Sequence, residues 1–178
     1  MAKVKYKSPK GYHSVTAALC VRGAAEALEF YARAFGAKER MRLMMPDGKI
    51  GHAEIEIGDT RVMLSDEFPE HGASPAALGG TTVALTLYVA DADAVFARAI
   101  EAGAKVKRPV QDQFYGDRSG RIEDPFGHNW SIQQRLEDVS PKKMQKRLDA
   151  LMAAGGLDPV DEKPAVRQRR KPKAKVEE

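Results

Sequence analysis

The sequence has very little cysteine: Cys20 is the only one among 178 residues. A single cysteine excludes an internal disulfide and any zinc site built from several thiolates. No apolar run approaches the ~20 residues that a membrane-spanning helix needs, and residues 1–7 lack the apolar core of a secretory signal. Phosphate-binding glycine loops, nucleophile elbows and zinc-protease motifs are also missing. We therefore expect a reduced, cytoplasmic protein with no membrane partner.

The net charge of +4 is distributed unevenly along the chain. Eleven of the 29 basic residues lie in residues 1–10 and 163–178, where only two of the 25 acidic residues are found. The remaining 18 basic and 23 acidic residues leave residues 11–162 acidic. A nucleic-acid-binding domain usually carries a basic face on its folded body. Nucleic acid is therefore not expected as the main partner.

The basic C-terminal tail contains three prolines, dense charge and no aromatic residue over residues 157–178. Such a segment cannot bury enough apolar surface to offset the entropy lost on ordering, so it is predicted to be disordered. It could simply solubilise the protein, or it could bind nucleic acid or anionic lipid electrostatically and serve a regulatory role.

The body of the chain repeats itself at an offset of 67 residues, since residues 25–38 and 92–105 are identical at six equivalent positions. The order of predicted elements repeats as well. Each copy has a strand of alternating polarity, then an apolar-striped helix that ends at glycine, then three strands. Such a repeat predicts two modules of the same fold.

The predicted fold class is α+β, with two β-α-β-β-β modules whose helices cover one face of each sheet. The other faces are expected to form a concave surface. A helix beginning at Ser140-Pro141 follows, and its apolar stripe could cover the sheet or contact a second chain. The expected boundaries are 1–11 for a basic N-terminal arm, 12–67 for the first module, 68–81 for a linker, 82–136 for the second module, 137–156 for the C-terminal helix and 157–178 for the tail.

Alternation along the strands assigns side chains to the two faces of each sheet. The apolar set is expected to pack against the helices and comprises Ala53, Ile55, Ile57, Met63, Ile122, Trp130 and Ile132. The opposite set is mostly polar and is expected to line the concave surface. A polar inner face opposite an apolar outer face is typical of a cup that holds a ligand.

Three stretches of the sequence carry a family resemblance, namely 24–31 with 34–37, 51–55 with 63–67, and 115–118 with 124–130. Together with the repeated module they are similar to the vicinal oxygen chelate superfamily, and specifically to its PhnB-like branch. That superfamily includes glyoxalase I, extradiol dioxygenases and bleomycin-resistance proteins. The resemblance covers about residues 12–135 and implies a cup, but no particular reaction, because this fold carries several.

Metal-dependent members of the superfamily place a His or Glu ligand on the first and fourth strands of each module. The resemblance maps these positions to Thr16, Leu64, Ala84 and Ser131. Leucine and alanine cannot coordinate a divalent ion, and a hydroxyl is a poor ligand. The resemblance therefore implies no metal at the usual positions. A divalent metal held instead by His52, Glu54 and His128 is the alternative.

Two motifs on the expected concave side allow more than one interpretation. His52 and Glu54 lie on one strand face, about 7 Å apart, and could contact a ligand or exchange protons with it, or could simply face solvent. Arg118 follows a predicted turn at Tyr115 and could clamp an anionic or carbonyl group. Alternatively, Arg118 pairs with Asp117 and fixes the loop.

The function predicted from the resemblance is binding of a small molecule in the cup without a metal, as bleomycin-resistance relatives sequester drugs. In that family a second chain often completes the cup, so a homodimer is expected. The alternative is a glyoxalase-type lyase, isomerase or dioxygenase with a relocated metal or with His52 and Glu54 as acid and base. The residues expected to contact the ligand are Thr16, His52, Glu54, Leu64, Ala84, Tyr115, Arg118, Arg121, Asn129 and Ser131.

Overall fold

The computed structural model describes residues 8–9, 11–68, 70 and 72–156. The basic tail predicted over 157–178 and most of the N-terminal arm lie outside these residues. Among the residues that are described, no helix is long and apolar enough to cross a membrane.

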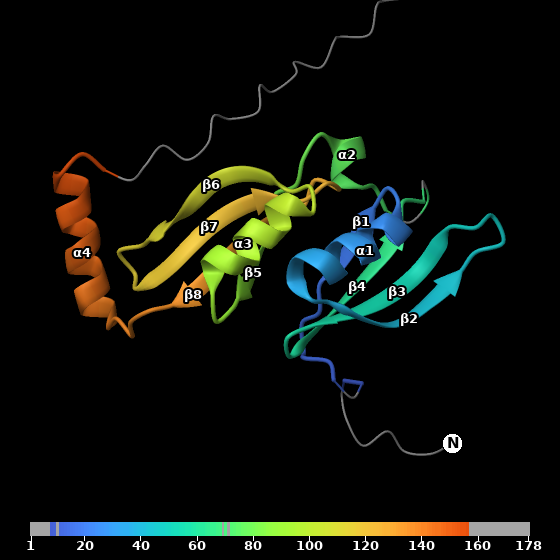
Figure 1. Ribbon diagram of the computed structural model, residues 1–178, viewed down its shortest axis with the longest axis horizontal. Helices are drawn as coiled ribbons and strands as arrows, with labels where there is room; N and C mark the ends of the chain where they lie inside the picture. Colours follow the sequence, from blue (N-terminus) through green and yellow to red (C-terminus); the bar gives the residue numbers. More distant parts are fainter. Residues whose placement is uncertain (1–7, 10, 69, 71, 157–178) are drawn as a thin grey trace, which may run out of the picture.

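Two modules with the same order of elements make up the body (Figure 1). The first contains β1 (Ala18–Val21), α1 (Ala24–Phe35), β2 (Lys38–Met44), β3 (Ile50–Ile57) and β4 (Thr60–Asp66). The second contains β5 (Ala84–Tyr88), α3 (Ala92–Glu101), β6 (Lys105–Asp112), β7 (Asp117–Glu123) and β8 (Asn129–Arg135). The predicted β-α-β-β-β order and the α+β class are confirmed.

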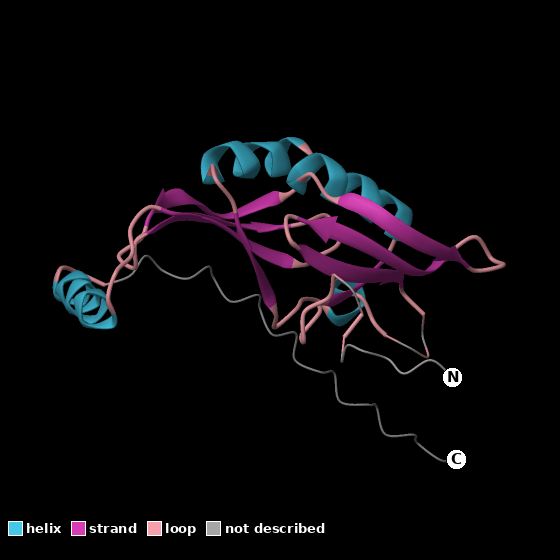
Figure 2. Cartoon of the chain, turned by 90° about the horizontal axis from the view of Figure 1, so that it is seen from below, coloured by secondary structure: helices cyan, strands magenta, loops and turns pink. Residues whose placement is uncertain are grey.

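Each module forms a four-stranded mixed sheet, with strand orders β1-β4-β3-β2 and β5-β8-β7-β6. The first strand of each module pairs in parallel with the last, and the other neighbours are antiparallel. Figure 2 shows α1 and α3 on the same side of both sheets. We call the opposite side of the two sheets the open face, and it lies away from these helices in both modules.

Helix α1 buries one continuous apolar face that includes Leu28, Phe30, Tyr31 and Phe35. The helix ends at Gly36, which adopts the left-handed conformation with φ of 69°. The backbone amides at this end donate hydrogen bonds to the carbonyl oxygens of Ala32 and Tyr31. Glycine is favoured at such a position because it has no Cβ to clash. The helix therefore ends where the sequence predicted.

The two modules share one hydrophobic core. Trp130 of β8 lies against the rings of Tyr31 and Phe35 of α1, with ring centroids 5.6 and 4.7 Å apart. Phe126 reaches the same aromatic group from the turn before β8. The modules are thus joined through their helical sides, which leaves their open faces pointing in the same direction (Figure 2).

Two further helices lie outside the modules. A short helix, α2 (Pro75–Leu78), lies within the segment that was predicted to link the two modules. Helix α4 (Pro141–Ala153) begins at Ser140, whose hydroxyl accepts a hydrogen bond from the Lys143 amide. This helix buries none of its residues and lies beyond the β6–β7 end of the molecule (Figure 1), so it does not cover its own sheet.

Candidate functional site

The open face of the first module presents three ionisable side chains of β3. Ala53, Ile55 and Ile57 are buried on the helix side, whereas His52, Glu54 and Glu56 alternate to the open face and remain partly accessible. Because side chains alternate along a strand, one face of β3 packs into the core and the other presents polar groups.

Glu54 is the centre of a small charged group on this face. Its carboxylate lies 3.6 Å from His52 Nε2 and accepts a hydrogen bond of 3.1 Å from Arg61 Nη1. The neighbouring Tyr12 hydroxyl lowers the pKa of Glu54 most, and His52 and Arg61 lower it further. Glu54 therefore stays ionised at neutral pH, and His52 and Glu54 are brought together as predicted.

The expected position of Leu64 on the concave side is wrong. Leu64 pairs with Ala53 and Leu19 on the helix side and is only 1% exposed. The hairpin after β3 sets a register in which Met63, not Leu64, lies opposite Glu54. Because side chains alternate along a strand, Met63 belongs to the open face, which also corrects its predicted packing against the helices.

The open face of the second module is built from β5, β7 and β8. Ala84 pairs with Asn129, and Arg121 pairs with Ser131, so the four lie on adjacent strands of one face. Ile122 and Trp130 occupy the opposite face, in the core, as predicted. In the first module, the predicted ligand-contacting residue Thr16 does not lie on a strand. It is half-buried and comes two residues before β1.

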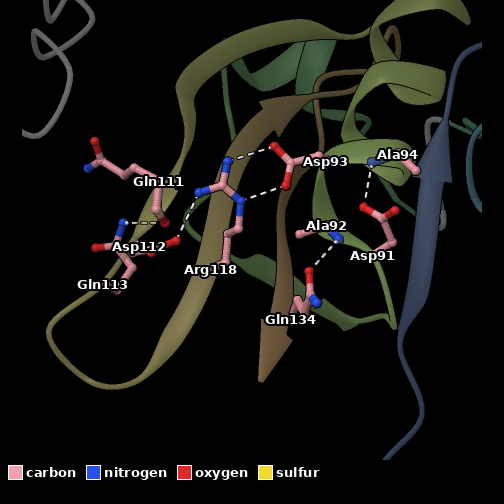
Figure 3. A network of polar contacts seen from close by, with 9 residues as sticks. All are labelled: Asp91, Ala92, Asp93, Ala94, Gln111, Asp112, Gln113, Arg118 and Gln134. Atoms are coloured by element: carbon pink, nitrogen blue, oxygen red, sulfur yellow. Dashed lines mark hydrogen bonds and ion pairs between the residues drawn. The ribbon is translucent and has the colours of Figure 1, made fainter. Parts of the chain in front are cut away.

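Arg118 does not belong to the open face (Figure 3). Its Nε and Nη2 donate to both carboxylate oxygens of Asp93 on α3, and its Nη1 donates to Asp112 at 2.8 Å. The predicted alternative, a pair with Asp117, is also wrong, because Asp117 is paired with Arg135. With two carboxylates bound on the helix side, Arg118 fixes α3 to the β6–β7 hairpin and is not placed to clamp a ligand in the cup.

Three residues of the second open face were missed by the sequence reasoning. Arg108 of β6 donates from Nη2 to Ser119 Oγ at 2.7 Å, and Ser119 Oγ is also 3.1 Å from the Tyr115 hydroxyl. Gln133 donates to Ser131 Oγ at 3.0 Å. These contacts join the predicted residues Tyr115 and Ser131 to a wider polar group.

An open pocket of about 580 Å³ lies where β1 meets the linker. Its walls include Ala18, Cys20, Pro75 and His128. Burial raises the pKa of the Cys20 thiol, with Glu67 and Asp66 adding to the effect, so the thiol stays protonated and is a weak nucleophile. His128 Nε2 already lies 3.2 Å from the Cys20 carbonyl oxygen. The pocket adjoins the open face at Ala18 and Cys20 of β1.

A family model described as the Glyoxalase/Bleomycin resistance protein/Dioxygenase superfamily matches residues 13–132. The chain belongs to this superfamily. An uncharacterized protein of Mycobacterium tuberculosis is 43% identical over 136 residues, which cover 74% of this chain and 80% of that protein. The crystal structure of TioX from Micromonospora sp. ML1 is 29% identical with a TM-score of 0.57, covering 70% of this chain and 99% of TioX. The PhnB protein of Bacillus cereus shares the fold at 18% identity and a TM-score of 0.52, over 68% of this chain and 99% of that one.

The residues that the resemblance maps to metal positions do not fit a divalent ion. Leu64 points into the core, and the open-face residues beside it are Met63 and Ser65. Thr16, Ala84 and Ser131 add only hydroxyl and methyl groups. The alternative set of His52, Glu54 and His128 does not form a site either, because no three His, Cys, Asp or Glu side chains within the described residues could hold an ion together.

Proposed function

We propose that this superfamily member binds a small, partly polar molecule on its open face, and that the ligand is held without a metal at the family's usual positions. The observation that carries the proposal is the division of each sheet into a sealed apolar side and an accessible polar side. On β7, for example, Ile122 is fully buried against the helices while Arg121 is exposed on the open face.

A second copy of the chain is the proposed cover of the open face. Both open faces point in the same direction, away from α1 and α3, so one partner surface can cover both (Figure 2). Large apolar side chains also remain exposed on the open face. Met41 and Leu43 of β2 lie opposite Glu54 and His52, and Tyr88 of β5 is 58% exposed. Exposed apolar groups of this size are typical of an interaction surface.

The test is a thermal-shift screen of small metabolites and antibiotics, run with and without added divalent ions. A ligand present at 100 times its Kd should stabilise the fold by about 2.7 kcal/mol. The site is located with Ala84→Phe, which adds a ring to the open face, and with the matched control Ala97→Phe on the exposed side of α3. We expect the first variant to abolish the shift and the second to preserve it. Equal responses of the two variants would place the ligand elsewhere.

The second candidate function is glyoxalase-type enzymatic activity, and the observation that favours it is the contact between His52 and the ionised Glu54. A carboxylate beside an imidazole can orient it for proton transfer. Metal analysis of protein purified without chelators separates the two functions. One divalent ion per chain, lost in His52→Ala, would support the enzyme and contradict metal-free binding.

A further inference from the structure

Two arginines pair across neighbouring strands of the second open face. Arg108 of β6 and Arg121 of β7 are direct partners across the strands. Neither forms an ion pair with a carboxylate in the part of the chain that the structure describes. Like charges placed opposite each other on neighbouring strands destabilise a sheet unless something else neutralises them.

Two carboxylates of the same strand, those of Glu123 and Asp117, are engaged by other basic residues. Glu123, two residues beyond Arg121, lies 3.3 Å from Lys107 Nζ and 3.9 Å from Lys105 Nζ. Asp117 is buried and lies 2.6 Å from Arg135 Nε. The positive charge of the two facing arginines is therefore left uncompensated by the described residues.

Neutral hydrogen-bonding groups surround the arginines. Ser119 Oγ connects Arg108 to the Tyr115 hydroxyl, while Gln133 and Ser131 are joined on the next strand. The Nε of Arg108 is buried and has no hydrogen-bond acceptor among the described residues. A buried charged donor without an acceptor is unfavourable, so an acceptor supplied from outside would stabilise this group.

We propose that these six residues, here called the Arg108–Arg121 cluster, bind an oxyanion group of the ligand, a carboxylate or a phosphate. The cluster consists of Arg108, Tyr115, Ser119, Arg121, Ser131 and Gln133. A guanidinium presents parallel N–H donors that match two oxygens of such a group. This inference rests on the proposed function and specifies its ligand as an anion.

The open face of the first module offers a contrasting environment. The positions equivalent to Ser119 and Arg121 by the 67-residue repeat are His52 and Glu54. There the carboxylate of Glu54 is neutralised within the chain by Arg61. Arg61 Nε is also buried without an acceptor among the described residues, but Arg61 Nη1 is paired with Glu54. The uncompensated positive charge therefore lies in the second module, to which we assign the anion.

The experiment is an NMR titration of the full chain at low ionic strength with inorganic phosphate, benzoate and neutral benzamide. We expect saturable shifts of the Ser119 and Arg121 amides with phosphate or benzoate. Arg108→Met and Arg121→Met should each weaken this binding about tenfold or more, which is the scale of a lost charged hydrogen bond. Arg121 is exposed, so its variant should fold even if the Arg108 variant does not.

Arg33→Met is the matched control, since it removes the same charge from an exposed position on α1. An unchanged Kd for the anion in Arg33→Met would support a specific site at the cluster. If Arg33→Met weakened binding as much as the cluster variants do, the effect would be one of net charge, and the inference would be overturned. Phosphate alone binding would indicate a phosphate-type group, and benzoate alone a carboxylate. Benzamide binding as tightly as benzoate would overturn the anion assignment but leave the proposed function standing. If the NMR shifts of the Ser119 and Arg121 amides depended on protein concentration and not on added anion, the cluster would be a contact with a second copy of the chain. That result would also overturn the anion proposal.

Discussion

Asp124 links the two modules through a single carboxylate. It is only 1% exposed, and it accepts hydrogen bonds from the Tyr31 hydroxyl at 2.8 Å and from Trp130 Nε1 at 2.9 Å. The amides of Phe126 and His128 donate to its other oxygen. A buried charge is tolerated when its hydrogen bonds are satisfied in this way. Burial, followed by the charge of Asp124, raises the pKa of Tyr31, which keeps its hydroxyl protonated as a donor.

Replacing Tyr31 with phenylalanine should destabilise the protein by about 1.5–3 kcal/mol, because a buried carboxylate loses one donor while the ring packing is retained. Urea unfolding followed by circular dichroism measures the change. Tyr88→Phe is the matched control, since the Tyr88 side chain is largely exposed on β5. Equal stability of Tyr31→Phe and wild type would show that the hydroxyl contributes nothing to the junction.

At the level of single residues, the sequence predicted the core role of Trp130 but missed Arg108. Simple alternation from Val106, which pairs with the core residue Ile122, would place Arg108 on the helix side. Register shifts on either side of Arg108 turn its side chain to the open face instead. The available signal was Pro109, because a proline within a strand indicates an edge or a bulge.

Among the secondary-structure elements, helix α1 has its N-terminus capped by a side chain from strand β4. Its N-cap residue, Gly23, has no side chain that could cap the helix. Asp66, at the end of β4, accepts hydrogen bonds from the amides of Gly23 and Ala24 at 3.1 and 2.9 Å, and from the Ile50 amide at 2.7 Å. One carboxylate therefore accepts hydrogen bonds from the backbone amides at the start of helix α1 and at the start of strand β3.

Asp66→Ala should lower the free energy of unfolding by about 1–2 kcal/mol, as expected for a lost helix cap. Hydrogen exchange should also quicken at the Gly23, Ala24 and Ile50 amides, which a general loss of packing would not single out. Asp59→Ala, in the exposed turn before β4, serves as the control. Unaltered exchange at those three amides would contradict the assigned cap.

The sequence predicted where the elements lie better than it predicted which way their side chains point. All six predicted strands after the helices were found, but the faces predicted for Met63 and Leu64 were exchanged. Counting from a family motif cannot set the register, whereas the turn between β3 and β4 does so by placing Ile57 opposite Thr60. From that pair onward, Val62 and Leu64 must share the buried face of Ile55.

For the whole molecule, ion pairs at the surface of both modules hold carboxylates in their ionised form. The pKa values of Glu39, Glu56 and Asp93 are lowered chiefly by hydrogen bonds from Arg42, Arg40 and Arg118, respectively. The pKa values of Glu67 and Glu137 are lowered chiefly by hydrogen bonds from Arg22 and Lys143, and that of Glu54 chiefly by the Tyr12 hydroxyl. In the unfolded chain these groups regain their ordinary pKa values, about 4.5 for glutamate and 3.8 for aspartate.

Acid should therefore destabilise the protein. Between the lowered folded pKa values and the ordinary ones, the unfolded chain binds more protons, so the stability from these groups is complete above about pH 4.5 and is lost as the pH falls through the folded values. Urea midpoints measured from pH 7 to 3 should decline below pH 4.5, and Glu54→Gln should decline less steeply than wild type. Glu101→Gln, at the exposed end of α3, should follow wild type. Stability that rises on acidification would mean that these carboxylates are held with raised pKa values, contrary to the ion pairs described above.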